Sequence, residues 1–330
     1  VSMPQVIEAC AKESFWTQEG SSWIKHPRNP GPSPHLRRGV GIACSFKNVG
    51  YSFGFPEHSW AQIEIYGTST IEKVIGNASG ADVGQGSHTA VVQMTAEAVG
   101  VPIERVHIHT HDTAGTQSSG SASASRLVFM AGNAIRGAAQ LALQKWASEE
   151  RPAIADFMYR PPPTTPYEPV TGKSTPNYAY GYVAQAVEVQ VDIETGFIDI
   201  LDVVSTHDVG KIINPQGLVG QVEGAVIQAQ GYAVMENLIS VEGKLKNPYF
   251  STYLIPTALD IPHRIKPVLL EYPDPIEPWG ARGMPEMPSL TLPPALAAAI
   301  HDATGVWLNK LPFTPDSVVK ALRARGLGGI

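Results

Sequence analysis

Apolar residues alternate with polar ones along several short segments of the chain, and elsewhere they recur every three or four residues. Alternation places one face of a β-strand in a core, whereas the wider spacing places one face of an α-helix there. Strands are predicted in "GVGIACSF" (39–46), "HSWAQIEIYG" (58–67), "STIEKVIG" (69–76) and "ERVHIHTHDT" (104–113). Two longer strands are predicted across 181–210, joined by a turn at Glu194-Thr195-Gly196.

Helical spacing occurs in both halves of the chain. Val6, Ile7 and the residues from Ala9 to Ala11 predict a helix within residues 1–20, and a glycine turn leads into a helix over 81–102. Further helices are predicted at about 126–147, after the glycine turn in "NPQGLVGQVEG" (214–224), at about 293–304 and at about 315–324. Since helices and strands occur in both halves, the expected fold class is α+β, built as two mixed α/β lobes.

Two proline-rich segments interrupt these patterns, "KHPRNPGPSPH" (25–35) and "RPPPTTPYEPVTGKSTP" (160–176). Proline fixes φ and removes a backbone donor, so such runs separate regular elements. We therefore expect an N-terminal helix and linker at 1–38, a first lobe at 39–165 and a second lobe at 166–330. The apolar face of the helix near 126–147 is expected to form the core of the first lobe.

Composition and charge exclude several classes of partner. The 330 residues carry 24 Lys and Arg against 30 Asp and Glu, a net charge of −6, and no basic stripe is interleaved with aromatic residues, so no nucleic-acid partner is expected. The apolar stretch "LPPALAAAI" is too short to cross a bilayer, and no membrane span is expected. Cys10 and Cys44 form no CxxC pattern, and the N-terminus lacks the features of a secretory signal, which favours a cytoplasmic protein with reduced thiols.

Three turns rich in small residues are candidate anion sites. "VGQGSH" (83–88) and "VGQVEG" (219–224) each place Gly-Gln-X at an expected helix start, where free N–H groups and the helix dipole can bind a phosphate. "SSGSASASR" (118–126) offers hydroxyl and N–H groups at a third helix start. For the two Gly-Gln turns the pattern alone favours a purely structural helix start, and for the serine-rich turn it leaves both interpretations open.

Histidines and one glutamate are the other candidates for chemistry. His107, His109 and His111 share one face of a predicted strand, but their Cβ atoms would lie about 6 to 7 Å apart, which favours solvated or hydrogen-bonded histidines over a metal site. Glu286 is the only acid in "GARGMPEMPS" (280–289), between two methionines and two prolines. If Met284 and Met287 point inward they would exclude water from this carboxylate, as suits a general base; the alternative is a surface-loop glutamate.

The chain contains no GxSxG, no P-loop and no GxGxxG followed by an acid, so hydrolase, nucleotide triphosphatase and nicotinamide-dependent functions have no support. Five ordered segments within residues 39–325 instead resemble the second half of the molybdenum-binding subunit of the molybdenum hydroxylases, the xanthine dehydrogenase and aldehyde oxidase family. They are "VGQGSHTAVVQMTAEAVGVP", "SGSASASR", "THDVGKIINPQGLVGQVEGAVIQAQGYAVME", "YLIPTALDIP" and "GARGMPEMPSLTLPPALAAAIHDATGV" with the following "LPFTPDSVVKAL".

The resemblance implies roles for the candidate residues. Gly84, Gln85 and Gly86 match the loop next to molybdenum, and Ser123, Ala124 and Ser125 match the small-residue loop that touches the pyranopterin and borders the substrate pocket. Gln221 matches a glutamine that helps to hold the phosphate or nucleotide end of the cofactor, expected to be molybdopterin cytosine dinucleotide carrying molybdenum. Glu286 matches the catalytic glutamate, which takes a proton in a hydroxylation with water as the oxygen source.

The resemblance also implies partners, since the family's first molybdenum-binding half, its iron–sulfur domains and its flavin domain are absent from this chain. The chain is expected to be inactive alone and to work as a medium subunit, separately encoded or cleaved, similar to that of nicotinate dehydrogenase. Its partners would be a subunit carrying the first half, an iron–sulfur subunit and a flavin subunit with FAD. The small-molecule substrate would be an N-heterocycle or an aldehyde, and the electrons would leave through the iron–sulfur clusters.

The segment Arg282-Gly283-Met284-Pro285-Glu286-Met287-Pro288 departs from the family pattern Lys/Arg-Gly-Val-Gly-Glu-Pro-Pro. In particular, Pro285 stands where a glycine precedes the glutamate, which fixes φ and removes an N–H beside the base. Two other functions therefore stay open: a catalytically silent paralogue that keeps the cofactor-binding loops, and an assembly module for another subunit.

Overall fold

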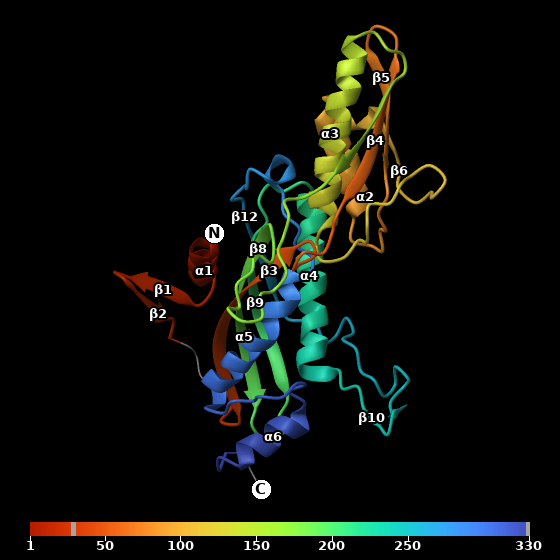
Figure 1. Ribbon diagram of the computed structural model, residues 1–330. Coiled ribbons are helices and arrows are strands. Elements are labelled where there is room, and N and C mark those ends of the chain that lie inside the picture. Colours follow the sequence, from red (N-terminus) through yellow and green to blue (C-terminus); the bar gives the residue numbers. More distant parts are fainter. Residues whose placement is uncertain (28–30, 328–330) are drawn as a thin grey trace.

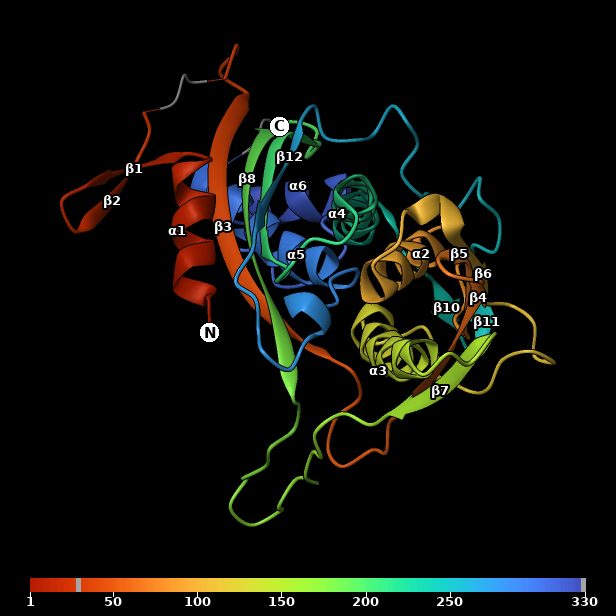
Figure 2. The ribbon, with the colours of Figure 1, turned by 90° about the horizontal axis from the view of Figure 1, so that it is seen from above.

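The computed structural model describes residues 1–27 and 31–327, in which two four-stranded sheets are separated by layers of helices (Figures 1 and 2). The predicted α+β class is confirmed. Residues 28–30, which belong to the predicted proline-rich linker, lie outside the described residues. Within the described part of the chain, no helix is long and apolar enough to cross a membrane.

The larger sheet, here called the β8 sheet, has the strand order β12-β9-β8-β3. Its strands are β3 (Leu36–Val49), β8 (Ala179–Asp192), β9 (Ile198–Asp208) and β12 (Ile265–Leu270). The first three pair antiparallel and β12 lies parallel to β9. One face packs against α4 (Pro215–Gln230), α5 (Met287–Thr304) and α6 (Pro315–Arg323), and the other against α1 (Met3–Lys12).

The second sheet, here called the β4 sheet, has the order β6-β5-β4-β7. Its strands are β4 (Ser59–Gly67), β5 (Ile71–Ala78), β6 (Val106–His109) and β7 (Ala153–Tyr159), and its helices are α2 (Ser87–Val99) and α3 (Leu127–Ala147). The alanine-rich face of α3 is buried against the sheet, as the sequence predicted for the core of this lobe. Figure 2 shows α2 and α3 facing α4 and α5, so that both helical layers lie between the two sheets.

Smaller elements connect these layers. They are the hairpins β1 (Trp16–Glu19) with β2 (Ser22–Lys25) and β10 (Ser240–Val241) with β11 (Lys244–Leu245), the short helices η1 (Ile103–Arg105) and η3 (Pro278–Gly280), and a π-helical turn η2 (Gly231–Met235) that extends α4.

Several predicted boundaries were wrong by a few residues. The first helix lies within residues 1–20 as predicted, but it ends at Lys12 and an unpredicted β-hairpin follows it. The strand expected over 104–113 is confined to Val106–His109, and η1 occupies the residues before it. Helix α5 begins at Met287 rather than near 293, since Pro288 lies in the first turn, where its missing N–H costs no helical bond. Pro293 and Pro294 lie inside the helix and leave two such bonds unmade.

The division of the chain into lobes at residue 166 stays a proposal, and one strand does not follow it. β3 precedes the β4 sheet in sequence but pairs with β8 along its full length, from Leu36 opposite Asp192 to Val49 opposite Ala179. Pairing partners so distant in sequence leave no local signal, so the pattern of apolar residues identified the strand but not its sheet.

Two glycines of β3 allow α5 to lie directly on the β8 sheet. A Cβ on Gly39 would lie 2.3 Å from the carbonyl oxygen of Ala299, and one on Gly41 would lie 2.2 Å from that of Ala295. Any larger residue would therefore push the helix away from the strand. This close contact fixes the position of the helix N-terminus, where Glu286 lies.

Candidate functional site

A cleft of about 310 Å³ is lined by residues from the N-terminal parts of α2, α3 and α4 and from the segment before α5. It is lined by the start of α2, the loop before α3, residues 209–221, and residues 281–286. Of the predicted site residues, the cleft brings together Gln85, Gly86, Ser123, Ser125, Gln221 and Glu286. Gly84 and Ala124 lie next to lining residues in the chain but are not themselves part of the lining.

The start of α2 is a glycine turn, as predicted, but its N–H groups are not all free. Gly86 caps the helix with φ of 77°, and the carboxylate of Asp82 accepts hydrogen bonds from the N–H groups of Gly84 (2.9 Å), Gly86 (3.2 Å) and His88 (2.9 Å). Partial burial raises the pKa of Asp82, but these donors outweigh it and lower the pKa below its usual value. The expected anion cradle therefore already holds a carboxylate of the chain itself.

The two glutamines differ in their surroundings. The side chain of Gln85 accepts from Val83 N (2.7 Å) and donates to the carbonyl of Ala81 (2.7 Å), so it holds its own loop in shape. Gln221 lies in the middle of α4, which begins at Pro215 with Asn214 as its cap. The prediction that "VGQVEG" opens a helix was therefore wrong, because the preceding Asn-Pro pair supplies the start signal.

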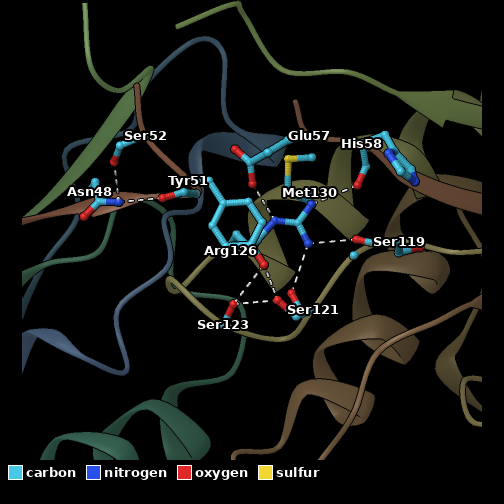
Figure 3. Close-up of polar contacts among 12 residues, drawn as sticks. Asn48, Tyr51, Ser52, Glu57, His58, Ser119, Ser121, Ser123, Arg126 and Met130 are labelled. Atoms are coloured by element: carbon cyan, nitrogen blue, oxygen red, sulfur yellow. Dashed lines mark hydrogen bonds and ion pairs between the residues drawn. The ribbon is translucent and has the colours of Figure 1, made fainter. Parts of the chain in front are cut away.

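The loop before α3 is held by Arg126, a residue that the sequence pattern did not single out (Figure 3). Its fully buried guanidinium binds the carboxylate of Glu57 (2.7 Å) and the carbonyls of Ser119 (2.8 Å) and Ser121 (3.0 Å). It also donates to the carbonyl of His58 at 2.8 Å. A buried charge needs such partners. The only sequence signal was the arginine itself at the end of a serine-rich loop.

This loop carries backbone strain beside the cleft. Ala124 and Ser125 have φ of 52° and 51°, a conformation that residues with a Cβ seldom adopt. Ser123 is oriented by hydrogen bonds of its hydroxyl with Tyr51 (3.1 Å) and Ser121 (2.6 Å). Strain of this kind persists only where the surroundings impose it, and it is concentrated at functional sites.

Gly283 lies directly against the strained loop. A Cβ on Gly283 would lie 1.5 Å from the carbonyl oxygen of Ser125, so no other residue fits this position. We expect Gly283→Ala to lower the free energy of unfolding by about 1–3 kcal/mol, through displacement of one segment or the other. Urea unfolding of the purified protein measures this change.

A second glycine provides the matched control for Gly283→Ala. Gly224 lies inside α4, and a Cβ there would meet no atom within 4 Å. Gly224→Ala is therefore expected to stabilise the protein by roughly 0.5–1 kcal/mol, since alanine favours a helix. Equal effects of the two substitutions would contradict a special role for the contact between Gly283 and Ser125.

Glu286 is the residue directly before α5, at the rim of the cleft. Its Oε2 accepts a hydrogen bond from Ser125 Oγ at 2.9 Å and lies 3.2 Å from Lys47 Nζ. Met284 and Met287 do point inward, as the sequence suggested, but they pack into the core beneath the loop and not over the carboxylate. The Glu286 side chain is 46% exposed, so the expectation that this chain alone keeps it dry was wrong.

Arg282 joins the segment that carries Glu286 to the β8 sheet. Its guanidinium binds Asp208 Oδ2 (2.8 Å) at the end of β9 and Glu277 Oε2 (3.1 Å), both fully buried. Burial raises the pKa of Glu277 to about 8, although Arg282 acts in the opposite direction. This network holds the backbone a few residues before the cleft rim.

The three histidines do not form a cluster. His107 and His109 lie on β6, His111 lies beyond its end, and His109 Nδ1 is hydrogen-bonded to Asn77 Oδ1 at 3.0 Å. Among the residues that the structure describes, no three His, Cys, Asp or Glu side chains are grouped closely enough to hold a metal ion.

Comparison with known proteins identifies the family. A family model described as "Molybdopterin cofactor-binding domain" matches residues 10–153 and 141–262. The chain belongs to this family. It is 30% identical to the "Xanthine dehydrogenase molybdenum-binding subunit" of Escherichia coli O157:H7 over 98% of this chain and 46% of that protein. It is 28% identical to the "Aldehyde oxidoreductase" of Megalodesulfovibrio gigas over 87% of this chain and 33% of that protein.

The fold agrees with this assignment. The crystal structure of the aldehyde oxidoreductase from Desulfovibrio desulfuricans matches with a TM-score of 0.79 and 28% identity, covering 88% of this chain and 33% of that chain. The protein is therefore a molybdopterin-binding chain of the molybdenum hydroxylase family. It spans less than half the length of the curated relatives that it matches.

Proposed function

We propose that the chain is the second part of the molybdenum-binding subunit of a hydroxylase that uses water as its oxygen source. One observation carries this proposal: Gln85, Ser125, Gln221 and Glu286, far apart in sequence, line one cleft in a molybdopterin-binding chain. An N-heterocycle or an aldehyde is the proposed substrate class, supported by relatives named xanthine dehydrogenase and aldehyde oxidoreductase.

The polar groups of the cleft fit the pterin and phosphate parts of a molybdenum cofactor. Gln221 is half-buried, and its amide forms no hydrogen bond with another described residue, so a donor and an acceptor remain for a ligand. We propose that Gln221 binds the phosphate or nucleotide end of a cytosine dinucleotide form of the cofactor. We propose that the pterin is bound by Ser123, Ala124, Ser125 and the Gly84-Gln85-Gly86 turn. When bound, the cofactor supplies two-electron redox chemistry, which iron–sulfur and FAD groups on partner subunits would continue.

Glu286 is the group of this chain that would take up the proton. A hydrogen bond from Ser125 and an ion pair with Lys47 hold Oε2, while Oε1 forms no hydrogen bond with any described residue and is available to a reacting molecule. Closure of the cleft by the rest of the enzyme would then remove the water that reaches Glu286 in this chain.

Exposed apolar side chains support an obligate assembly. The segment between η2 and β12, which projects from the body near β10 in Figure 1, exposes large apolar residues by 54% to 96%. They are Leu238, Tyr249, Phe250, Leu254 and Leu259. Apolar patches of this kind usually mark interaction surfaces. We propose that the subunit carrying the first half covers them, within a heteromer that includes iron–sulfur and flavin subunits and is located in the cytoplasm.

Isotope labelling of the product tests this function. The complex copurified with the chain is given a dye as electron acceptor and an N-heterocycle or an aldehyde in water enriched in ¹⁸O. We expect one labelled oxygen in each product molecule, and none when only dioxygen is labelled. Product labelled from dioxygen, or a molybdenum-loaded complex that oxidises neither substrate class, would overturn the proposal.

A further inference from the structure

The register between β3 and α5 determines which residue lies beside Glu286. The backbone around Ala299 and Ala303 lies over Gly39, and that around Ala295 and Ala299 lies over Gly41. A step of two residues along the strand, about 6.6 Å, therefore matches a step of four residues back along the helix, about 6 Å. Repeating this step toward the end of β3 brings Lys47, on the same face of the strand, level with residues 283–287.

The close pairing continues to the end of the sheet. Lys47 lies opposite Gly181 of β8, and a Cβ on Gly181 would lie 2.3 Å from the Cε atom of Met287. The first turn of α5 therefore rests on this glycine. As a result Glu286, one residue earlier, is placed beside Lys47.

Lys47 itself is held firmly. Its side chain is only 19% exposed, and its ammonium group donates to the carbonyl oxygen (3.1 Å) and to the side-chain Oδ1 (3.0 Å) of Asn48. Its third contact is Glu286 Oε2 at 3.2 Å. The ammonium group is therefore held by two hydrogen bonds to Asn48 and by the ion pair with Glu286.

We propose that Lys47 is a positioning residue for the glutamate, a role that rests on the proposed function of Glu286. Ser125 Oγ, in the loop before α3, donates to Oε2, and the Lys47 ammonium on β3 forms an ion pair with the same oxygen, so that together they fix the carboxylate and leave Oε1 without a partner among the described residues. A flexible, half-exposed glutamate would otherwise occupy several rotamers. With Oε2 held by Lys47 and Ser125, only Oε1 of Glu286 remains to take up a proton.

Kinetics of two Lys47 variants of the assembled enzyme test this role. We expect Lys47→Met to lower kcat about tenfold, because Glu286 loses the ion pair that orients its carboxylate, with KM within about twofold of the wild-type value. Lys47→Arg keeps a charged donor and is expected to recover most of the loss. Lys12→Met is the matched control, because Lys12 binds Glu8 at 2.6 Å on the exposed side of α1, and it should leave kcat unchanged.

Two further measurements separate positioning from stability and from the function itself. We expect Lys47→Met to lower kcat without changing the urea midpoint. We also expect Lys47→Met to lower kcat less in a Ser125→Ala background than in the wild type, since both residues hold the same oxygen of Glu286. Wild-type kcat in Lys47→Met, or the same loss of kcat in Lys47→Arg as in Lys47→Met, would overturn the role of Lys47. If Glu286→Gln is inactive in the same experiment, the proposed function of Glu286 still holds. A fully active Glu286→Gln variant would overturn the proposed function, and the role of Lys47 with it.

Discussion

Replacing Glu286 with glutamine is expected to lower kcat of the assembled enzyme by about a thousandfold, within the range that general bases contribute. Glutamine has nearly the same shape and can still accept from Ser125 Oγ, which lies 2.9 Å from Glu286 Oε2, but it cannot take up a proton. The loss should therefore fall on kcat rather than on KM. Steady-state turnover of an N-heterocycle or an aldehyde measures it.

The control for Glu286→Gln is an acid of the same type away from the cleft. Glu194 is exposed in the turn between β8 and β9, and Glu194→Gln is expected to keep wild-type turnover. Wild-type kcat in Glu286→Gln would mean that Glu286 is an ordinary loop residue. A wild-type complex that contains the cofactor but turns over no substrate would instead favour the silent-paralogue interpretation, which the proline before Glu286 leaves open.

Replacing Arg126 with methionine is expected to cause the largest loss of stability, about 3–5 kcal/mol. Arg126 and Glu57 have side-chain exposures of 1% and 2%, so the substitution leaves a carboxylate buried without its partner. The carbonyls of Ser119 and Ser121 lose their donor as well, and the strained residues Ala124 and Ser125 lose their support. Urea unfolding of the purified protein measures the loss.

A double substitution distinguishes the buried charge from simple packing. Glu57→Gln removes the charge that Arg126→Met leaves unpaired, so the double variant should be more stable than Arg126→Met alone. If the losses of stability in Arg126→Met and Glu57→Gln simply added in the double variant, the ion pair between the two residues would not be the interaction that stabilises the loop. Lys320→Met, which breaks an exposed pair with Asp316 on α6, is the control and should change stability by less than about 0.5 kcal/mol.

Much of the fold could be predicted because it depends on local patterns. Alternation identified three strands of each sheet but missed the edge strands β7 and β12, and the spacing of apolar residues identified α3 and α6 almost to the residue. Prolines misled the prediction at the start of α5, because the rule that proline ends a helix does not hold in a first turn. The pairing of β3 with β8 depends on contacts between residues far apart in sequence and left no pattern to detect.

The candidate site was predicted less completely, for the same reason. Glycine turns and the acid in "GARGMPEMPS" were visible, and the structure places them on one cleft. The residues that hold them were missed: Asp82 fills the α2 turn, Arg126 holds the serine-rich loop, and Lys47 binds the glutamate from another strand. A single charged residue in a sequence does not reveal its partner, so such contacts emerge only from the fold.

The most direct test of the central claim is the molybdenum and pterin content of the complex copurified with this chain, wild type and Glu286→Gln. We expect about one molybdenum and one molybdopterin per chain in both proteins, because Glu286 acts on the proton and does not hold the cofactor. Turnover is expected in the wild type only. A wild-type complex that contains neither molybdenum nor pterin while its subunits remain assembled would contradict a cofactor-binding role and favour an assembly module.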